Sequence, residues 1–141
     1  MRVLFICTGN MCRSPAAEKL LAQYGAGRGF ETRSRGTGVQ PGFGLHKRIA
    51  ALLEADKIAG LEHRGSLVTE PDVDWADLII VMEEGHRDAL AERFPQSMRK
   101  TRLLLEDKDL EDPMGKDEKV FREVYETIKA SVKKLAEEQE K

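Results

Sequence analysis

The sequence has few cysteines: only Cys7 and Cys12, close together near the start of the chain. A secreted scaffold held by disulfides would carry more of them, spread along the chain. Two cysteines without a second pair or matched histidines also supply too few ligands for zinc, so we expect no metal. The pair instead indicates a reactive thiol in a chain that stays in a reducing compartment.

Long apolar runs are also missing. No stretch approaches the roughly 18 residues of a membrane span, and the run VLFIC after Arg2 is too short for the core of a signal peptide. We therefore expect a cytoplasmic protein that does not enter a membrane. The formal net charge of only -2 gives no electrostatic reason to expect a nucleic-acid partner.

The composition is that of a soluble globular domain. Hydrophobic residues make up 40 % of the chain and charged residues 34 %, which argues against disorder. The 141 residues are enough for one core and show no linker or repeat. We expect a single domain spanning residues 1–141.

Apolar patterns predict strands that alternate with helices. Short apolar runs predict strands at 2–6, 78–81 and 102–105, with a weaker signal at 30–35. Helical spacing predicts helices at 14–24, around 45–53, at 83–94 and at about 117–139. This alternation is typical of an α/β protein with an open parallel sheet, in which a ligand binds beyond the carboxyl ends of the strands.

A short loop follows the first predicted strand and leads directly into a helix. Gly9 and Asn10 tolerate positive φ, so the loop can turn tightly and point successive N–H groups into one concavity. With the helix N-terminus, such a concavity binds anions. Arg13 adds a planar fork suited to two phosphate oxygens. The expected phosphate-binding residues are Thr8, Gly9, Asn10, Met11, Cys12, Arg13 and Ser14.

Cys7 lies at the base of this loop. The dipoles that attract phosphate also stabilise a thiolate, and Ser14 is placed to donate a hydrogen bond to the sulfur. The expected chemistry has two steps through a cysteinyl-phosphate intermediate. It needs a carboxylic acid to protonate the leaving group. The acidic stretch 106–118 offers several candidates, between which composition does not choose: Asp107, Asp109, Glu111, Asp112 and Asp117.

The loop CTGNMCRSP, followed by Ala16, Ala17 and Glu18, resembles that of the low-molecular-weight protein tyrosine phosphatases. The resemblance extends over nearly the whole chain. The segment SRGTG at 34–38, the pair His63–Arg64, the run ADLIIVM at 76–82 and the pair Asp112–Pro113 are all similar to segments of that family.

The resemblance implies a fold and a role for each matching residue. The fold would be a four-stranded parallel sheet with helices on both faces. Cys7 would be the nucleophile, Arg13 the phosphate clamp, and Asp112 the general acid and later the base. A network of Asn10, Ser14, Ser34 and His63 would brace the loop. Cys12 would be a redox partner that forms a reversible disulfide with Cys7. The family needs no cofactor or metal.

The substrate is less sharply indicated. We expect phosphotyrosine on proteins, because Met11 is large like the Ile or Leu of tyrosine phosphatases. Phosphoarginine is the alternative: Phe43 is the only aromatic residue expected in the opposite wall of the pocket, and Met114 follows Asp112–Pro113 where tyrosine phosphatases often carry aromatics. The chain also departs from the family in having Arg35 where alanine is usual.

Two other functions compete with a protein phosphatase. An arsenate reductase of the same fold would need further cysteines for an internal relay, and none follows Cys12, which leaves only a version that uses an external thiol. A non-catalytic phosphate-binding module would predict loss of the nucleophile or the acid, yet Cys7 and Asp112 are both present. We therefore expect a monomeric enzyme acting on phosphorylated proteins.

Overall fold

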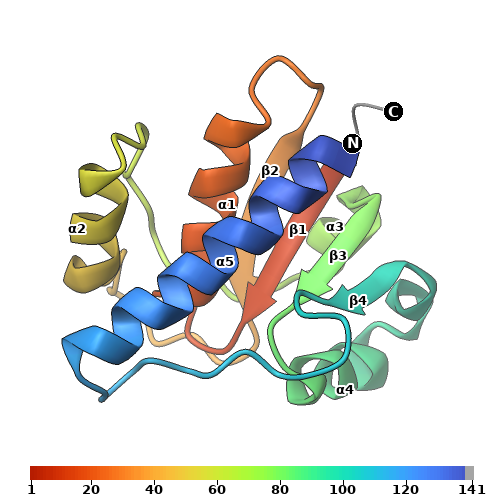
Figure 1. The fold of residues 1–141 in the computed structure, drawn as a ribbon. Helices are drawn as coiled ribbons and strands as arrows, with labels where there is room; N and C mark the ends of the chain where they lie inside the picture. Colours follow the sequence, from red (N-terminus) through yellow and green to blue (C-terminus); the bar gives the residue numbers. More distant parts are fainter. Residues whose placement is uncertain (139–141) are drawn as a thin grey trace.

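A four-stranded parallel sheet lies at the centre of the computed structural model, which describes residues 1–138 (Figure 1). Its strands are β1 (Arg2–Cys7), β2 (Glu31–Gly36), β3 (Leu78–Val81) and β4 (Thr101–Leu103). Their order is β2-β1-β3-β4, and each neighbouring pair is parallel. The expected α/β fold with a four-stranded parallel sheet is confirmed.

Strand β1 has a core on each of its faces. Val3, Phe5 and Cys7 belong to one buried cluster, while Leu4 and Ile6 belong to the other. Successive side chains of a strand point to opposite faces of the sheet, so a strand covered on both faces is apolar throughout. This explains the unbroken apolar run, and it buries the end of the strand at Cys7.

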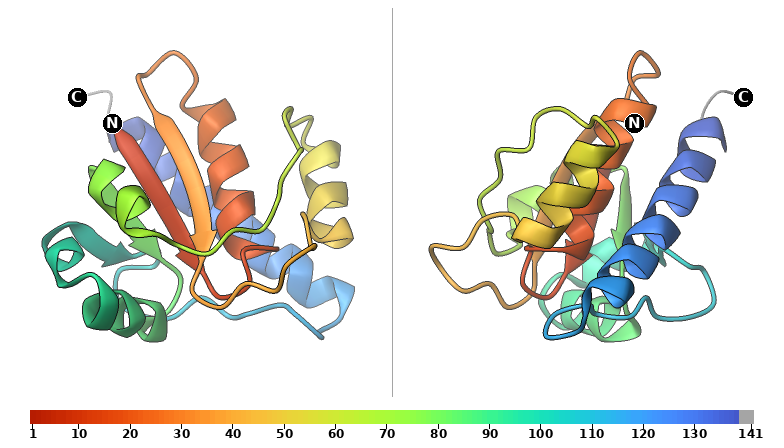
Figure 2. Two further views of the ribbon diagram at one scale, coloured as in Figure 1. Left: turned by 180° about the vertical axis from the view of Figure 1, so that it is seen from behind. Right: turned by 60° about the vertical axis from the view of Figure 1, so that its left-hand side comes forward.

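The helices cover both faces of the sheet (Figures 1 and 2). On one face lie α1 (Arg13–Tyr24) and α5 (Glu118–Glu138), with α2 (Lys47–Ala55) packed beside them. On the other face lie α3 (Glu70–Trp75) and α4 (Glu84–Arg93), followed by the 3₁₀ helix η1 (Pro95–Lys100). Three layers result, as expected.

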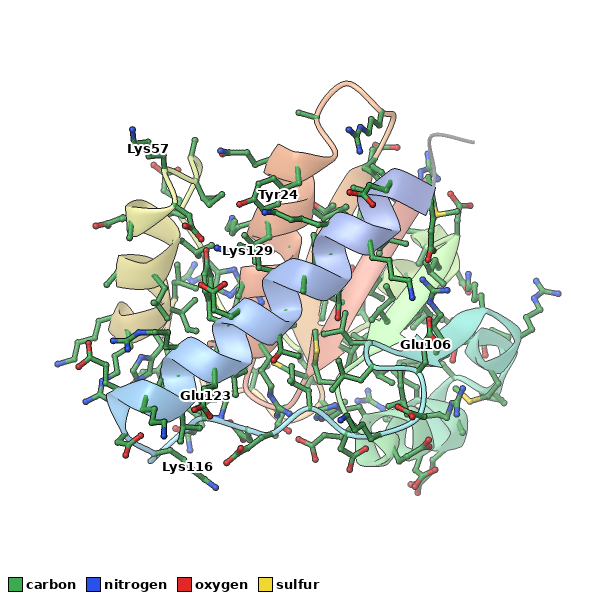
Figure 3. All side chains as sticks on the ribbon, viewed as in Figure 1. Tyr24, Lys57, Glu106, Lys116, Glu123 and Lys129 are labelled. Carbon is green, nitrogen blue, oxygen red and sulfur yellow. The ribbon has the colours of Figure 1, made fainter. Side chains whose placement is uncertain are left out.

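Helices α2 and α5 are joined by a polar cluster. The Tyr125 hydroxyl donates to Asp56 Oδ2 at 2.6 Å, and Lys129 Nζ lies 2.9 Å from the same oxygen. Lys129 projects from α5 near α2 in Figure 3. The cluster ties the end of α2 to the middle of α5 at the border of the core.

Element boundaries differ slightly from those expected. The first helix begins at Arg13, and the third expected helix runs from Glu84 to Arg93. The fourth strand ends at Leu103 rather than at residue 105, because Leu104 and Leu105 lie in a turn that leads to Glu106 at a φ of 68°. Residue 139, the expected end of the last helix, lies outside the described residues.

Two short helices were not expected, α3 and η1. Helix α3 begins with a capping box, in which the Thr69 hydroxyl accepts from Asp72 N and the Asp72 carboxylate accepts from Thr69 N.

None of the helices within residues 1–138 combines the length and the hydropathy that a membrane span requires.

Candidate active site

The loop between β1 and α1 opens into a pocket at the carboxyl end of the sheet. The pocket has a volume of about 240 Å³. Residues of the loop and of two further segments line it: Cys7, Thr8, Gly9, Met11, Cys12, Arg13, Gly38, Gln40, Asp112 and Met114. The sheet topology brings these segments together at the place where parallel sheets bind their ligands. The expected phosphate loop and the expected acid therefore meet in one pocket.

The sulfur of Cys7 is held by polar groups of the same loop. The side chain is buried, with 3 % exposure. Cys7 Sγ lies 2.9 Å from Ser14 Oγ and accepts from the backbone N–H of Asn10 at 3.3 Å. Both contacts favour negative charge on the sulfur. The sulfur faces the pocket from the buried end of β1.

Asn10 connects the loop to the neighbouring segment 63–66. Its φ of 55° is in the left-handed region, and the residue is fully buried. Its side chain donates to Ser14 Oγ at 2.8 Å and accepts from Ser66 N at 3.0 Å. The Asn10 carbonyl accepts from His63 Nε2 at 2.7 Å. Burial lowers the pKa of His63 below its usual value, while the Asn10 carbonyl acts in the opposite direction.

The expected bracing network is therefore assembled around Asn10, but Ser34 is placed differently from the other members. Its hydroxyl donates to Glu18 Oε1 at 2.7 Å, which joins β2 to α1 rather than to a loop atom. The contact between β2 and the loop is made instead by the Arg35 carbonyl, whose oxygen lies 3.4 Å from Ser14 Oγ. Neither Glu18 nor Ser66 was among the residues predicted to brace the loop.

Arg13 is buried beneath the pocket, with 2 % exposure. Its Nη1 lies 2.5 Å from Glu83 Oε2 and donates to the Leu110 carbonyl at 2.8 Å. Its Nη2 lies 3.5 Å from Asp112 Oδ2. These contacts occupy both hydrogens of Nη1 and leave Nε and Nη2 as the donors that a phosphoryl group can use.

Asp112 is the only expected acid candidate that lines the pocket. It lies on the segment before α5, which passes close to the end of β1 in Figure 1. The side chain is half exposed and accepts from Met114 N at 3.1 Å. Three of the other candidates have different contacts: Asp109 accepts from Glu84 N, Glu111 pairs with Lys116, and Asp117 caps the start of α5. The fourth, Asp107, does not line the pocket. Of the five candidates, only Asp112 therefore shares a pocket with Cys7.

Cys12 is buried beside the pocket. Burial raises the pKa of its thiol to about 12, and the neighbouring Cys7 and Asp112 act in the same direction. Its Sγ–H group points at Met114 Sδ, 3.4 Å away. Cys7 and Cys12 are both free. Cys12 is therefore a thiol and not a thiolate at neutral pH.

Glu83 and His86 also contact the loop, although neither was predicted as a site residue. Both belong to the start of α4, where His86 Nδ1 accepts from Glu83 N at 3.1 Å. His86 Nε2 lies 2.8 Å from Thr8 Oγ1. Burial and the nearby Arg13 lower the pKa of His86 to about 4. The only local signal was an acidic residue at the predicted start of a helix, at position 83, because the contact with the loop is tertiary.

The wall of the pocket contains no aromatic side chain among the described residues. Phe43, expected in the opposite wall, is 49 % exposed and does not line the pocket. The apolar part of the wall comes from Met11 and Met114.

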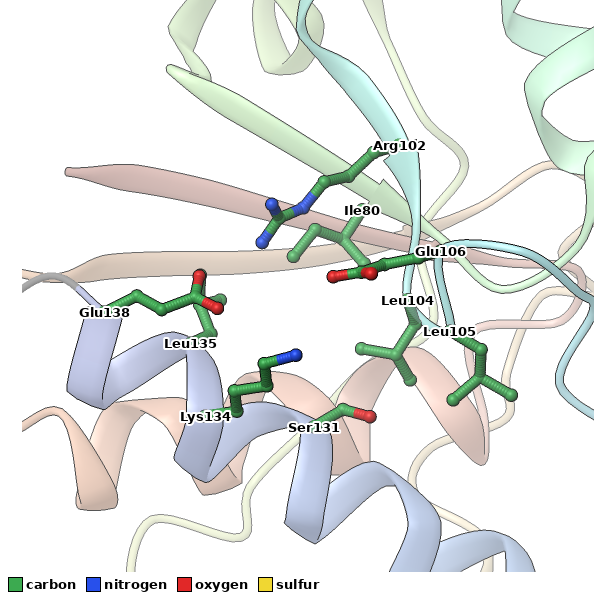
Figure 4. Close-up of a pocket in the computed structure, with 9 residues that line it drawn as sticks. All are labelled: Ile80, Arg102, Leu104, Leu105, Glu106, Ser131, Lys134, Leu135 and Glu138. Carbon is green, nitrogen blue, oxygen red and sulfur yellow. The ribbon is translucent and has the colours of Figure 1, made fainter.

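A second hollow, of about 160 Å³, lies between β4 and the end of α5 (Figure 4) and shares no residue with this pocket. Within residues 1–138, no group of three or more His, Cys, Asp or Glu residues is placed to hold a metal.

Comparisons with known proteins agree with this arrangement. A protein-arginine-phosphatase of Geobacillus stearothermophilus is 34 % identical over 96 % of this chain and 94 % of its own length. The structure of an arginine phosphatase from the same organism has a TM-score of 0.92 at 33 % identity, over 99 % of this chain and 92 % of that one. The structure of a low molecular weight protein tyrosine phosphatase from T. tengcongensis has a TM-score of 0.91 at 32 % identity. The match covers 98 % of this chain and 99 % of that one. The model of the low molecular weight phosphotyrosine protein phosphatase family matches residues 2–141, and the chain belongs to this family.

Proposed function

We propose that this phosphatase hydrolyses phosphotyrosine on proteins, with Cys7 as nucleophile, Arg13 as phosphate clamp and Asp112 as general acid. The observation that carries the proposal is the position of the Cys7 sulfur. It accepts from Asn10 N, lies 2.9 Å from Ser14 Oγ, and shares its pocket with the only acid candidate that lines it.

The first step transfers the phosphoryl group to sulfur. The Cys7 thiolate attacks phosphorus, and the bond from phosphorus to the tyrosine oxygen breaks. Asp112 gives its proton to the departing phenolate, which makes the leaving group neutral. Arg13 Nε and Nη2, with the N–H groups of loop residues 8–14, hold the phosphoryl oxygens as charge shifts between them.

The second step restores the enzyme. Asp112, now a carboxylate, takes a proton from a water molecule that attacks the cysteinyl phosphate. The bond between sulfur and phosphorus breaks, inorganic phosphate leaves, and Cys7 is a thiolate again. The hydroxyl of Ser14, near the sulfur, stabilises the thiolate as it departs.

Phosphoarginine is the second candidate substrate. The pocket wall has no aromatic side chain among the described residues that could stack on a phenol ring. A relative of similar sequence, from Geobacillus stearothermophilus, is named as a protein-arginine-phosphatase. Gln40 and Asp112 line the pocket and offer acceptors for the N–H groups of a guanidinium. Met11 favours phosphotyrosine, because its side chain is large, like the Ile or Leu of tyrosine phosphatases, and narrows the pocket that it lines with Cys7.

The deciding experiment measures initial rates on phosphotyrosine and phosphoarginine peptides of one sequence. It is run in reductant, with Cys7→Ser as the blank. We expect faster cleavage of phosphotyrosine. Faster cleavage of phosphoarginine would establish the second candidate. Absence of Cys7-dependent cleavage of both would overturn the proposal and favour arsenate reduction with an external thiol, or anion binding alone.

The Cys7–Cys12 redox pair, a cytoplasmic location and a monomeric state are further parts of this proposal. Two free cysteines at one pocket support the redox pair, and a sequence with no secreted disulfide pattern supports the location. Light scattering on the purified protein tests the monomer, and a dimer mass at micromolar concentration would refute it.

A further inference from the structure

A threonine and a histidine are joined at the edge of the catalytic pocket. Thr8 Oγ1 lies 2.8 Å from His86 Nε2, which is ordinary hydrogen-bond distance. Thr8 follows the nucleophile directly and lines the pocket. His86 lies on α4, more than seventy positions away in the chain, and is 4 % exposed. The contact therefore joins the second residue of the loop to a buried side chain of the opposite layer.

The direction of this hydrogen bond follows from the other nitrogen of the ring. His86 Nδ1 receives the backbone N–H of Glu83 at 3.1 Å, so Nδ1 has no hydrogen of its own. A neutral imidazole carries its single hydrogen on the remaining nitrogen. Burial and the adjacent Arg13 lower the pKa of His86, so the ring is neutral at pH 7. Nε2 therefore donates, and Thr8 Oγ1 accepts.

Accepting from His86 fixes what the Thr8 hydroxyl can do next. The hydrogen of Nε2 occupies one lone pair of Oγ1, so the hydroxyl hydrogen of Thr8 must point away from α4. The methyl group of Thr8 is turned toward Gly38 on the other side, 3.9 Å from where a Cβ at Gly38 would lie. The free hydrogen is left for an acceptor in the pocket that contains Cys7 and Arg13.

We propose that Thr8 donates its hydroxyl hydrogen to an oxygen of the bound phosphoryl group, and that His86 is the positioning residue that directs it there. The inference rests on the proposed phosphatase mechanism. It adds a side-chain donor to the backbone N–H groups and to Arg13. Glu83 takes part twice, since its carboxylate contacts Arg13 and its N–H sets the tautomer of His86. One short segment thereby orients two donors of the site.

Two substitutions of His86 separate positioning from folding. His86→Asn keeps an acceptor near the position of Nδ1, and so the contact with Glu83 N, but no longer reaches Thr8. His86→Gln places an amide near the position of Nε2 and can still donate to Thr8. Thr8→Val removes the hydroxyl at nearly constant shape, whereas Thr8→Ser retains it. Thr127→Val is the matched control, because the Thr127 hydroxyl donates to the Glu123 carbonyl on the surface of α5.

The test measures the dissociation constant of inorganic phosphate by calorimetry in the Cys7→Ser background, together with the thermal midpoint. This readout needs no turnover, so failure of the proposed reaction does not prevent it. We expect Thr8→Val to weaken phosphate binding about tenfold, the size of a hydrogen bond to a charged group. His86→Asn should weaken it several-fold, while Thr8→Ser, His86→Gln and Thr127→Val stay within about twofold of the parent.

The double variant Thr8→Val with His86→Asn should bind phosphate no more weakly than Thr8→Val alone, because His86 acts only through Thr8. Unchanged phosphate binding in Thr8→Val would overturn the inference. Weaker binding in His86→Gln equal to that in His86→Asn, with a matching loss of thermal midpoint in both, would also overturn it and leave His86 a purely structural residue.

Discussion

Arg13 Nη1 lies 2.5 Å from Glu83 Oε2, so the start of α1 and the start of α4 are joined beneath the pocket by an ion pair. The guanidinium is 2 % exposed, and the carboxylate is one-third exposed. Removing one partner of a buried pair leaves the other without compensation. The pair therefore affects both the stability of the fold and the orientation of the Arg13 guanidinium.

The first prediction concerns this pair. Glu83→Gln should lower the free energy of unfolding by about 1–3 kcal/mol, because the buried guanidinium loses its nearest negative charge. Urea denaturation measures the loss. Glu84→Gln is the matched control, since Glu84 is an exposed acid whose contact with Arg87 contributes little. Equal stability of the two variants would show that the Arg13–Glu83 pair has no net effect.

A second prediction separates the backbone of Asn10 from its side chain. Asn10→Gly loses the hydrogen bonds to Ser14 and Ser66, but accepts a φ of 55° without strain. Asn10→Ala loses the same bonds and is strained as well, by about 1 kcal/mol. Both variants should lose most of their activity. The alanine variant should be the less stable by this amount in urea, and the reverse order would contradict the left-handed geometry.

A third prediction concerns stability and pH. The pKa of His86 is 6.5 in an unfolded chain and is lowered to about 4 by burial. Between these values the unfolded state binds the proton and the folded state does not, so stability falls as the pH is lowered from 6.5 to 4. Burial lowers the pKa of His63 too, which adds a loss of the same sign.

The contribution of His86 to this loss is on the order of 3 kcal/mol. Urea midpoints measured every half pH unit give the slope. His86→Asn should flatten the curve between pH 6.5 and 4 without removing the part due to His63. A slope as steep in this variant as in the parent would assign the effect to other groups.

A fourth prediction tests the departure from the family at position 35. Arg35 Nε lies 3.0 Å from Asp72 Oδ2, and Arg33 Nη1 lies 3.1 Å from Asp72 Oδ1. Burial raises the pKa of Asp72, whereas hydrogen bonds from Thr69 and the charge of Arg35 lower it. The lowering effects are together the larger, so the pKa lies below its usual value. Arg35→Ala should cost about 1 kcal/mol, since Arg33 remains.

The activity of Arg35→Ala should stay within about twofold of the parent. Arg35 contacts Ser14 through its backbone carbonyl and not through its side chain, and the substitution keeps this carbonyl. A tenfold fall in kcat/KM would show that the side chain also takes part in substrate binding.

A fifth prediction concerns oxidation. Peroxide converts the Cys7 thiolate to a sulfenic acid and releases hydroxide; the Cys12 thiol then attacks this sulfur, a Cys7–Cys12 disulfide forms, and water leaves. Dithiothreitol should therefore restore the oxidised parent fully. Cys12→Ala should recover only partly after long exposure, because its sulfenic acid is open to further oxidation. Mass spectrometry checks the two products, and equal recovery would exclude a protective role for Cys12.

Much of the fold and of the catalytic loop is predictable from local chemistry. Strand β1 reads as a buried strand because both its faces are covered, and the loop residues reveal an anion site through their conformational preferences. The capping box of Thr69 and Asp72 was present in the sequence, but α3 spans six residues, too few for a helical apolar period to appear. Leu104 and Leu105 look like part of a strand, yet they pack against the core from a turn.

The remaining parts of the site depend on contacts between distant segments. Glu83 meets Arg13 only because β3 lies beside β1, and the sequence alone does not show which strands are neighbours. Ser34 meets Glu18 because β2 packs against α1. The place of Asp112 in the pocket likewise depends on the path of the chain between β4 and α5.

Cys7 ends β1, which has a neighbouring strand on each side and a packed layer on each face. A reagent reaches its sulfur through the pocket that Met11 and Met114 help to line. Bulky alkylating agents should thus react slowly with this thiol, whereas small tetrahedral anions enter freely. Covalent probes for this enzyme will work best when the reactive group is attached to a phosphate-like group, because a reagent must fit the pocket before it can react with Cys7.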